Sequence, residues 1–167
     1  MRGQRGQKNH IGLYSKNMKI NSLAFNNGKS IPSQYTCDGE GVNPELVFSD
    51  VPTGAKSLAL IVDDPDSPTG IWTHWLLWNI PPSIKEIAEG KVPRGAVQGE
   101  TTFGASRYGG PCPGKGNHRY FFKLYALDTM LNIPAGTVKD KFIEIMKGHI
   151  IAEAEMYGWY ERKKQDN

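Results

Sequence analysis

The sequence predicts a single, mainly β domain built from antiparallel strands. Three observations lead to this prediction. The chain has 167 residues, which suits one domain of ordinary size. Its apolar residues fall into short runs separated by turn clusters such as NNGK, DGEGVNP and DVPTG. A convincing long helical pattern occurs only once, near the C-terminus.

Two apolar runs have the composition of central strands. Ser57–Asp63 is almost continuously apolar, and Thr73–Ile80 is rich in tryptophan and leucine. Both runs are short, and neither alternates cleanly between apolar and polar residues. We therefore expect both strands to pack on two faces. The tryptophans Trp72, Trp75 and Trp78 are expected in the core and in the wall of a pocket.

The other strands are predicted from alternation and from the position of turns. Arg119–Leu127 alternates so that its even-numbered residues face the core. Ala152–Trp159 also alternates, as expected of a last strand. Two further runs, Lys19–Phe25 and Glu45–Phe48, complete the set.

One helix and one long loop are expected in the second half of the chain. Thr137–Lys147 carries apolar residues at helical spacing, with Thr137 as the N-cap and Gly148 at the C-terminal stop. The segment Thr101–Asn117 is rich in glycine and poor in large apolar residues. We expect it to form a long surface loop, a kind of segment that is often functional.

The formal net charge of +3 comes from the first residues of the chain. Four basic residues precede Met18, and the rest is close to neutral. No basic patch with interleaved aromatic residues follows, so nucleic-acid binding is not expected. We expect residues 1–18 to be a disordered extension, residues 19–162 to form one domain, and residues 163–167 to be a frayed tail.

The sequence also favours a cytoplasmic location. No apolar run reaches the length of about 20 residues that a membrane helix needs, and the first residues lack the apolar core of a secretory signal. The two cysteines, Cys37 and Cys112, do not have the spacing of a zinc site. In a reducing compartment we expect free thiols. A disulfide is the alternative, because both cysteines flank motifs that could meet in space.

Two polar clusters at strand ends are the candidate site. The first is DDPDSP at residues 63–68, followed by His74, and the second is GGPCPGKGNHRY at residues 109–120. Carboxylates beside histidines favour protonated imidazoles. Protonated histidines, the Tyr120 hydroxyl and the N–H groups of the glycine loop would together bind an anion.

These segments resemble a known family. DPDSP followed by HW, and then GPCPGKGNHRY, are similar to the two signature segments of the phosphatidylethanolamine-binding proteins. YTCDGEGVNPELVFSDVP and LYALD resemble its prokaryotic branch. The resemblance, which covers roughly residues 19–160, implies a β-sandwich of two antiparallel sheets with a few peripheral helices. It also implies a small pocket at one end for phosphate-like or carboxylate-like groups.

The resemblance also implies which residues form the site. Supporting positions are expected at Asp66, Pro68 and Arg119, with a cis peptide bond at Pro68. The expected ligand-binding residues are Asp64, His74, Gly110, Pro111, His118 and Tyr120.

We therefore expect a binding module without turnover, cofactor or metal, whose ligand is a small anion. A kinase or protease partner and a homodimer are expected from the resemblance, and membrane insertion is not. The main alternative is a hydrolase in which Asp64, Asp66, His74 and His118 hold a metal ion. A weaker alternative is a nucleophilic Cys112 beside His118.

Overall fold

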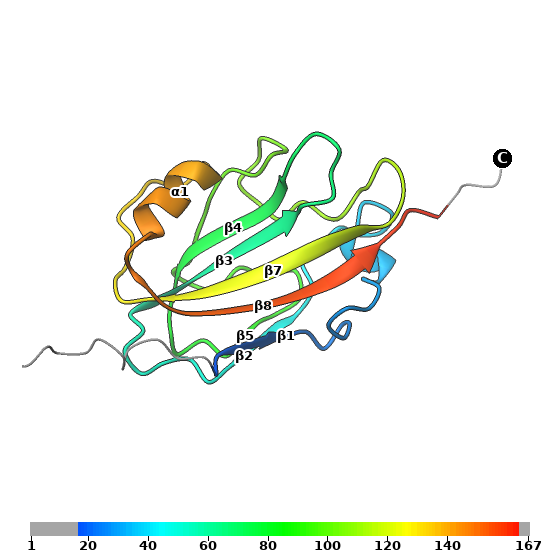
Figure 1. Ribbon diagram of the computed structural model, residues 1–167. Coiled ribbons are helices and arrows are strands. Elements are labelled where there is room, and N and C mark those ends of the chain that lie inside the picture. The colour runs from blue at the N-terminus through cyan, green and yellow to red at the C-terminus, as the bar shows by residue number, and fades with distance from the viewer. Residues whose placement is uncertain (1–16, 164–167) are drawn as a thin grey trace, which may run out of the picture.

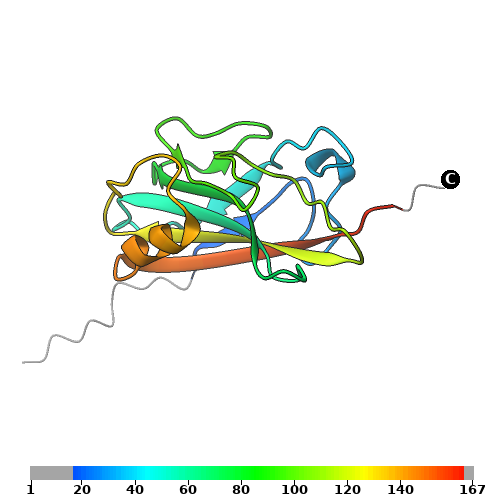
Figure 2. The same cartoon turned by 90° about the horizontal axis from the view of Figure 1, so that it is seen from above.

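The computed structural model describes residues 17–163, and its strands form two antiparallel sheets, as predicted (Figures 1 and 2). The larger sheet has the order β6-β4-β3-β7-β8, and the smaller has the order β1-β2-β5. The strands are β1 (Lys19–Asn21), β2 (Leu46–Ser49), β3 (Ser57–Asp64), β4 (Trp72–Ile80), β5 (Glu86–Ile87), β6 (Val97–Gln98), β7 (His118–Leu127) and β8 (Ile150–Tyr160). The helices are the 3-10 turn η1 (Ser33–Tyr35) and α1 (Lys139–Met146).

Strand β3 lies at the centre of the larger sheet, between β4 and β7. All of its residues are buried. Leu58, Leu60 and Val62 face the core between the two sheets, whereas Ala59 and Ile61 face a second core beneath α1. Apolar cover on both faces explains why this run does not alternate, and it confirms the prediction of a central strand.

Helix α1 covers the outer face of the larger sheet. Its residue Phe142 is fully buried and stacks on Trp78, with 5.3 Å between the ring centroids. The predicted helix of residues 137–147 is thus correct in position, but its predicted cap is wrong. The Thr137 hydroxyl donates to the carbonyl oxygen of Pro134 at 2.6 Å and makes no cap, and Val138 occupies the N-cap position.

Three features at the edges of the fold differ from the expectations. Strand β1 ends at Asn21, because the chain turns there, and Phe25 enters the core from a loop. Strands β5 and β6 have two residues each, too few for a sequence pattern. Met18, which we placed in the extension, is 3% exposed and belongs to the main core. The rest of the expected extension, and the expected tail after Lys163, lie outside the described residues.

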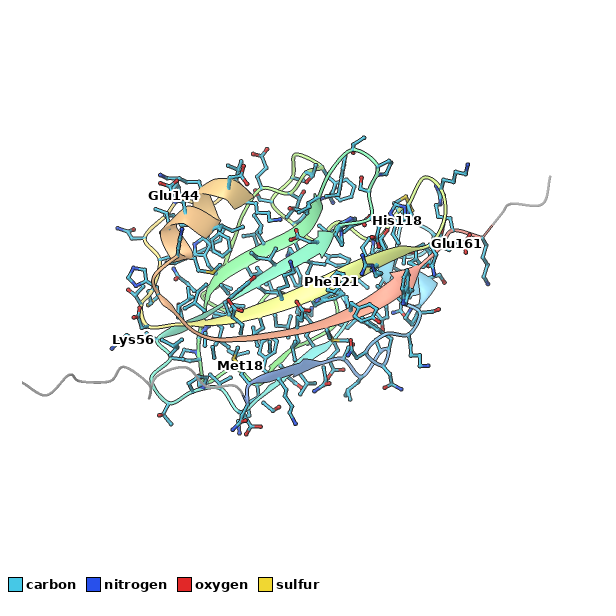
Figure 3. The ribbon with its side chains drawn as sticks, viewed as in Figure 1. Met18, Lys56, His118, Phe121, Glu144 and Glu161 are labelled. Atoms are coloured by element: carbon cyan, nitrogen blue, oxygen red, sulfur yellow. A yellow bond between two sulfur atoms is a disulfide. The ribbon has the colours of Figure 1, made fainter. Side chains whose placement is uncertain are left out.

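The candidate site lies at one end of the larger sheet, and Glu144 of α1 lies toward the other end. In Figure 3, His118 and Glu161 mark one end, and Lys56 and Glu144 mark the other. The chain from residue 101 to 117 reaches the first of these ends without a helix or strand, as predicted for a long loop. No helix between residues 17 and 163 is long and apolar enough to cross a membrane.

Candidate functional site

A cavity of about 250 Å³ opens where β3 ends and where β4 and β7 begin. The loop before β7 supplies the rest of its wall. Of the expected site residues, the structure brings together Asp64, Pro68, His74, His118 and Tyr120 around this cavity. The complete lining is Asp64, Ser67, Pro68, Trp72, His74, Phe103, Cys112, Pro113, Gly114, His118 and Tyr120.

Asp64 and His118 form a buried pair at the inner end of the cavity. The Nδ1 atom of His118 lies 2.7 Å from Oδ2 of Asp64, and its Nε2 atom lies 3.0 Å from the carbonyl oxygen of Lys115. An imidazole donates to two acceptors at once only when both nitrogens carry protons. The two side chains are 10% and 5% exposed, so little solvent screens the pair. These contacts match a cationic His118 beside an anionic Asp64.

A β-bulge directs His74 into the cavity. Val62 pairs with Trp75, and Asp63 pairs with Thr73, so His74 is the extra residue on β4. Bulges commonly re-aim a side chain next to a functional site. Thr73 then donates to Asp63 at 3.0 Å on the other face, where Lys139 of α1 also pairs with Asp63 at 2.8 Å. Asp63 therefore anchors the helix to the sheet and does not line the cavity.

The His74 ring is held as a neutral imidazole at pH 7. Burial lowers its pKa below the ordinary value of 6.5, and this outweighs the carbonyl oxygens of the glycine loop and the carboxylates of Asp64 and Asp63. The expectation of a protonated histidine is therefore wrong at this position. Nδ1 donates to the carbonyl oxygen of Gly109 at 2.7 Å, and Nε2 makes no hydrogen bond to the described residues.

The Tyr120 hydroxyl is a second polar group of the cavity. It is buried, and it completes no hydrogen bond of normal geometry with a described residue, although the Asp64 carboxylate lies close to it. Burial raises its pKa, and the nearby Asp64 carboxylate adds to the effect, so the group remains a neutral O–H donor. An unpaired buried hydroxyl costs about 1–3 kcal/mol, and a ligand oxygen in the cavity would recover this cost.

Gly110 and Pro111 do not line the cavity, in contrast to the expectation. The carbonyl oxygen of Pro111 accepts a hydrogen bond from the Cys37 N–H at 3.1 Å, away from the cavity. A Cβ atom on Gly110 would lie 2.8 Å from the carbonyl oxygen of Tyr35 and 2.9 Å from Cα of Thr36. These two residues therefore support the wall from behind by close packing against residues 35–37.

This packing predicts a large difference between two glycine variants of the same loop. Gly110→Ala is expected to lower the free energy of unfolding by about 1–2 kcal/mol, because backbone atoms block the new methyl group. Gly114→Ala is the control and should change it by no more than about 0.5 kcal/mol, since no atom lies within 4 Å. Chemical denaturation of both variants measures the difference. Equal losses would contradict the close packing.

Asp66 and Arg119 form a partly buried pair beside the cavity. Arg119 donates from Nε and Nη2 to the two carboxylate oxygens of Asp66, and its backbone N–H donates to the same group at 2.9 Å. The guanidinium lowers the pKa of Asp66 to about 2. The pair joins the turn after β3 to the start of β7.

Pro68 lines the cavity, but the expected cis peptide bond is absent. No peptide bond is cis between residues 17 and 163. The turn is closed instead by hydrogen bonds from Asp66 N–H to the Asp64 carboxylate and from Gly70 N–H to the carbonyl oxygen of Ser67. Gly70 takes a φ of 109°, so it completes the turn while Pro68 keeps the lower-energy trans form.

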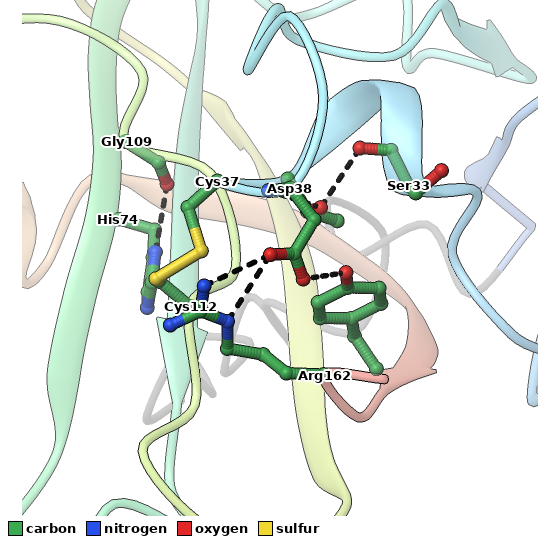
Figure 4. The surroundings of a disulfide bond; sticks show 9 residues. Ser33, Cys37, Asp38, His74, Gly109, Cys112 and Arg162 are labelled. Carbon is green, nitrogen blue, oxygen red and sulfur yellow. Dashed lines mark hydrogen bonds and ion pairs between the residues drawn. A yellow bond between two sulfur atoms is a disulfide. The ribbon is translucent and has the colours of Figure 1, made fainter. Parts of the chain in front are cut away.

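The cysteines form a disulfide, so the expectation of free thiols is wrong. Cys37 and Cys112 are 75 residues apart in sequence, and their Cα atoms lie 5.4 Å apart (Figure 4). The fold brings together the two loops that contain these cysteines. The expectation of free thiols rested on a reducing compartment, which carries no information about this contact. Because the Cys112 sulfur is bonded to Cys37, it is not available as a nucleophile in this state.

The residues proposed for a metal site do not converge. Asp66 is bound to Arg119, and both ring nitrogens of His118 have other partners. Across residues 17–163, no group of three or more His, Cys, Asp or Glu side chains is arranged to hold an ion. The ligand set required by the hydrolase alternative is therefore not assembled.

One prominent wall residue, Phe103, was not predicted from the sequence. Its ring packs edge-on against Trp72 and His74, at centroid distances of 5.5 and 5.1 Å. Besides Tyr108, it is the only aromatic side chain in the loop of residues 101–117. A phenylalanine in a glycine-rich loop was a usable signal, since such a side chain needs an apolar surface to cover.

The structure is thus a two-sheet β domain with a small cavity at one end of the larger sheet. The family model for phosphatidylethanolamine-binding protein matches residues 21–161, and the chain belongs to this family. The resemblance drawn from the motifs is thereby confirmed.

Similar proteins occur in archaea and bacteria. The UPF0098 protein of Methanothermobacter thermautotrophicus is 49% identical over 150 residues, which cover 87% of this chain and 99% of that protein. The crystal structure of CT736 from Chlamydia trachomatis, described as a homolog of phosphatidylethanolamine-binding protein, aligns with a TM-score of 0.86 and 47% identity over 89% of this chain and all of that chain. Escherichia coli YbcL, described as a member of the mammalian family, aligns with a TM-score of 0.80 and 32% identity over 87% and 99% of the two chains.

Proposed function

We propose that this protein is a non-enzymatic binding module whose cavity holds a small anion, either a phosphate monoester or a carboxylate. The observation that carries the proposal is the buried Tyr120 Oη, which completes no hydrogen bond of normal geometry and shares one cavity with the His74 ring and the Asp64–His118 pair. A volume of about 250 Å³ suits a headgroup-sized ligand.

Each polar group around the cavity has a different role in binding the anion. Tyr120 donates its hydroxyl proton, and the exposed Gly114 N–H, which makes no hydrogen bond within the described residues, offers a second donor. His118 contributes positive charge, held in place by Asp64. Because His74 is neutral, its Nε2 accepts a hydrogen bond from a protonated ligand, or it becomes protonated when the ligand binds. The site therefore favours an anion that arrives with a proton, such as a phosphate monoester monoanion.

Calorimetric titration with inorganic phosphate and with O-phosphoethanolamine near neutral pH tests this proposal. Saturable binding at millimolar concentration or below is expected. Absence of binding for both ligands and for acetate would refute it. Metal analysis of the purified protein tests the hydrolase alternative separately, and stoichiometric metal lost in His74→Ala would favour that alternative.

A matched pair of tyrosine variants separates binding from stability. Tyr120→Phe is expected to weaken phosphate binding about fivefold, because one donor is lost, without lowering the free energy of unfolding, because the hydroxyl completes no hydrogen bond of normal geometry with the protein. Tyr108→Phe is the control: its hydroxyl donates to the carbonyl oxygen of Tyr35 at 2.8 Å, so it should lose about 1 kcal/mol of stability. Titration and denaturation of both variants give the comparison. The reverse pattern would exclude Tyr120 from the ligand site.

Three further properties belong to the proposal through the family resemblance. We propose that the protein acts in the cytoplasm, that it self-associates as a homodimer, and that ligand binding lets it modulate a kinase or a protease. Light scattering on the purified chain tests the dimer. Inhibition assays with a protease and a kinase, in the presence and absence of phosphate, test the modulation.

A further inference from the structure

We propose that the Cys37–Cys112 disulfide is a reversible redox modification site that controls the cavity. This inference rests on the proposed function of the cavity as an anion site. Cys112 lines the cavity, whereas Cys37 belongs to the segment after η1, on the other side of the cavity wall. One covalent bond thus joins the cavity wall to a neighbouring part of the fold (Figure 4).

The two sides of the bond are held very differently. On the Cys37 side, the Asp38 carboxylate accepts hydrogen bonds from Tyr160 at the end of β8 and from the Arg162 guanidinium. The Thr36 hydroxyl adds a bond to the carbonyl oxygen of Ser33 at 2.8 Å. This segment is therefore fixed to the larger sheet independently of the disulfide.

On the Cys112 side, Pro113 is buried, but the three residues after it donate few hydrogen bonds of their own. The N–H groups of Gly114, Lys115 and Gly116 make no hydrogen bonds within the described residues, and Gly116 takes a φ of 77°. A chain rich in glycine loses much conformational freedom when it is ordered. The disulfide limits that freedom, and it thereby holds the Lys115 carbonyl oxygen against His118.

The bond is open to chemical attack. Both cysteines are exposed, and exposed disulfides are the labile and regulatory kind. A thiolate of a dithiol reductant forms a bond to Cys37 Sγ, and Cys112 Sγ leaves with the electron pair. The second thiol of the reductant then displaces Cys37. The reductant ends as a disulfide, and two protons end on the two protein thiols. In the cytoplasm, where we propose that the protein acts, disulfides are usually of this transient type.

Reduction releases the wall and lowers the affinity of the cavity. With the bond broken, residues 112–116 sample more conformations. Ligand binding must then order them again, and the lost conformational entropy reduces the binding free energy. We expect phosphate to bind the reduced protein about tenfold more weakly than the oxidised protein. Reoxidation should restore the affinity.

The test is a phosphate titration of the full chain before and after treatment with dithiothreitol without denaturant, with thiol alkylation and mass measurement to establish the redox state. The Cys37→Ser/Cys112→Ser double variant should match the reduced protein, and if that variant does not fold, the reduced wild type serves alone. Hydrogen exchange of the Gly109 and Cys37 N–H groups, which donate to the carbonyl oxygens of His74 and Pro111, should accelerate on reduction when it is measured without ligand.

The outcomes separate this proposal from the proposed function. Equal phosphate affinity and equal exchange in the two redox states overturn the redox proposal, as does a disulfide that is reduced only in denaturant. If neither state binds phosphate, the proposed function fails, while faster exchange on reduction still supports the disulfide as the tie that orders the wall.

Discussion

Replacing Asp64 with alanine is expected to lower the free energy of unfolding by about 3 kcal/mol. The carboxylate is almost fully buried, and it pairs with His118 at 2.7 Å while also accepting the Asp66 N–H at 2.8 Å. Its removal leaves a buried imidazole whose Nδ1–H has no acceptor. Removing one member of a buried pair is costly for this reason, even where the intact pair adds little net stability. Chemical denaturation at neutral pH measures the loss.

The more accessible pair next to Asp64, Asp66 and Arg119, supplies the control. Asp66→Ala removes a carboxylate whose side chain is 26% exposed and whose partner Arg119 is 41% exposed. Water screens this pair and solvates what remains of it, so a clearly smaller loss of stability is expected. A loss for Asp66→Ala as large as that for Asp64→Ala would show that burial does not set the cost. Asp64→Asn, which keeps the shape and the acceptor for Asp66 N–H, should fall between the two.

The main strands of the fold were predictable from the sequence, because the number of buried faces of a strand determines its pattern of apolar residues. Strand β3 is covered on both faces and reads as a continuous apolar run, whereas β7 is covered mainly on one face and alternates. Strands β5 and β6 leave no such mark, since two residues cannot show a period. The helix was found from the spacing of Phe142 and Met146, but its first turn was misjudged, because a threonine can bond backward to a carbonyl oxygen as readily as it caps.

The candidate site was only partly predictable. The motifs placed Asp64, His118 and Tyr120 at strand ends, and the pairing of β3 with β7 brings them together. The orientation of His74 depends on a bulge, and the disulfide depends on the meeting of two loops 75 residues apart. Neither is encoded in a local pattern. The protonation of His74 was misjudged for a related reason: the sequence shows the neighbouring carboxylates but not the burial that outweighs them.

Burial of His74 gives the protein a stability that depends on pH. Its pKa in the folded protein lies below the value of 6.5 that we take for the unfolded chain. As the pH falls below 6.5, the unfolded chain takes up a proton that the folded protein resists, so the unfolded state is favoured. The contribution is fully present above pH 6.5, and it is lost as the pH falls toward the folded pKa. The slope from this one group is at most about 1.4 kcal/mol per pH unit.

Denaturation of the wild type and of His74→Gln, at several values between about pH 5 and about pH 8, isolates this contribution. Glutamine does not titrate, so the other acidic and basic groups cancel in the comparison, and the wild type should lose more stability on acidification. Parallel curves would show that His74 titrates normally. Phosphate should flatten the wild-type curve, because an anion in the cavity stabilises the protonated ring and a ligand of the folded state raises its stability. By the same linkage, phosphate affinity should increase as the pH falls below 6.5, and His74→Gln should lose this dependence.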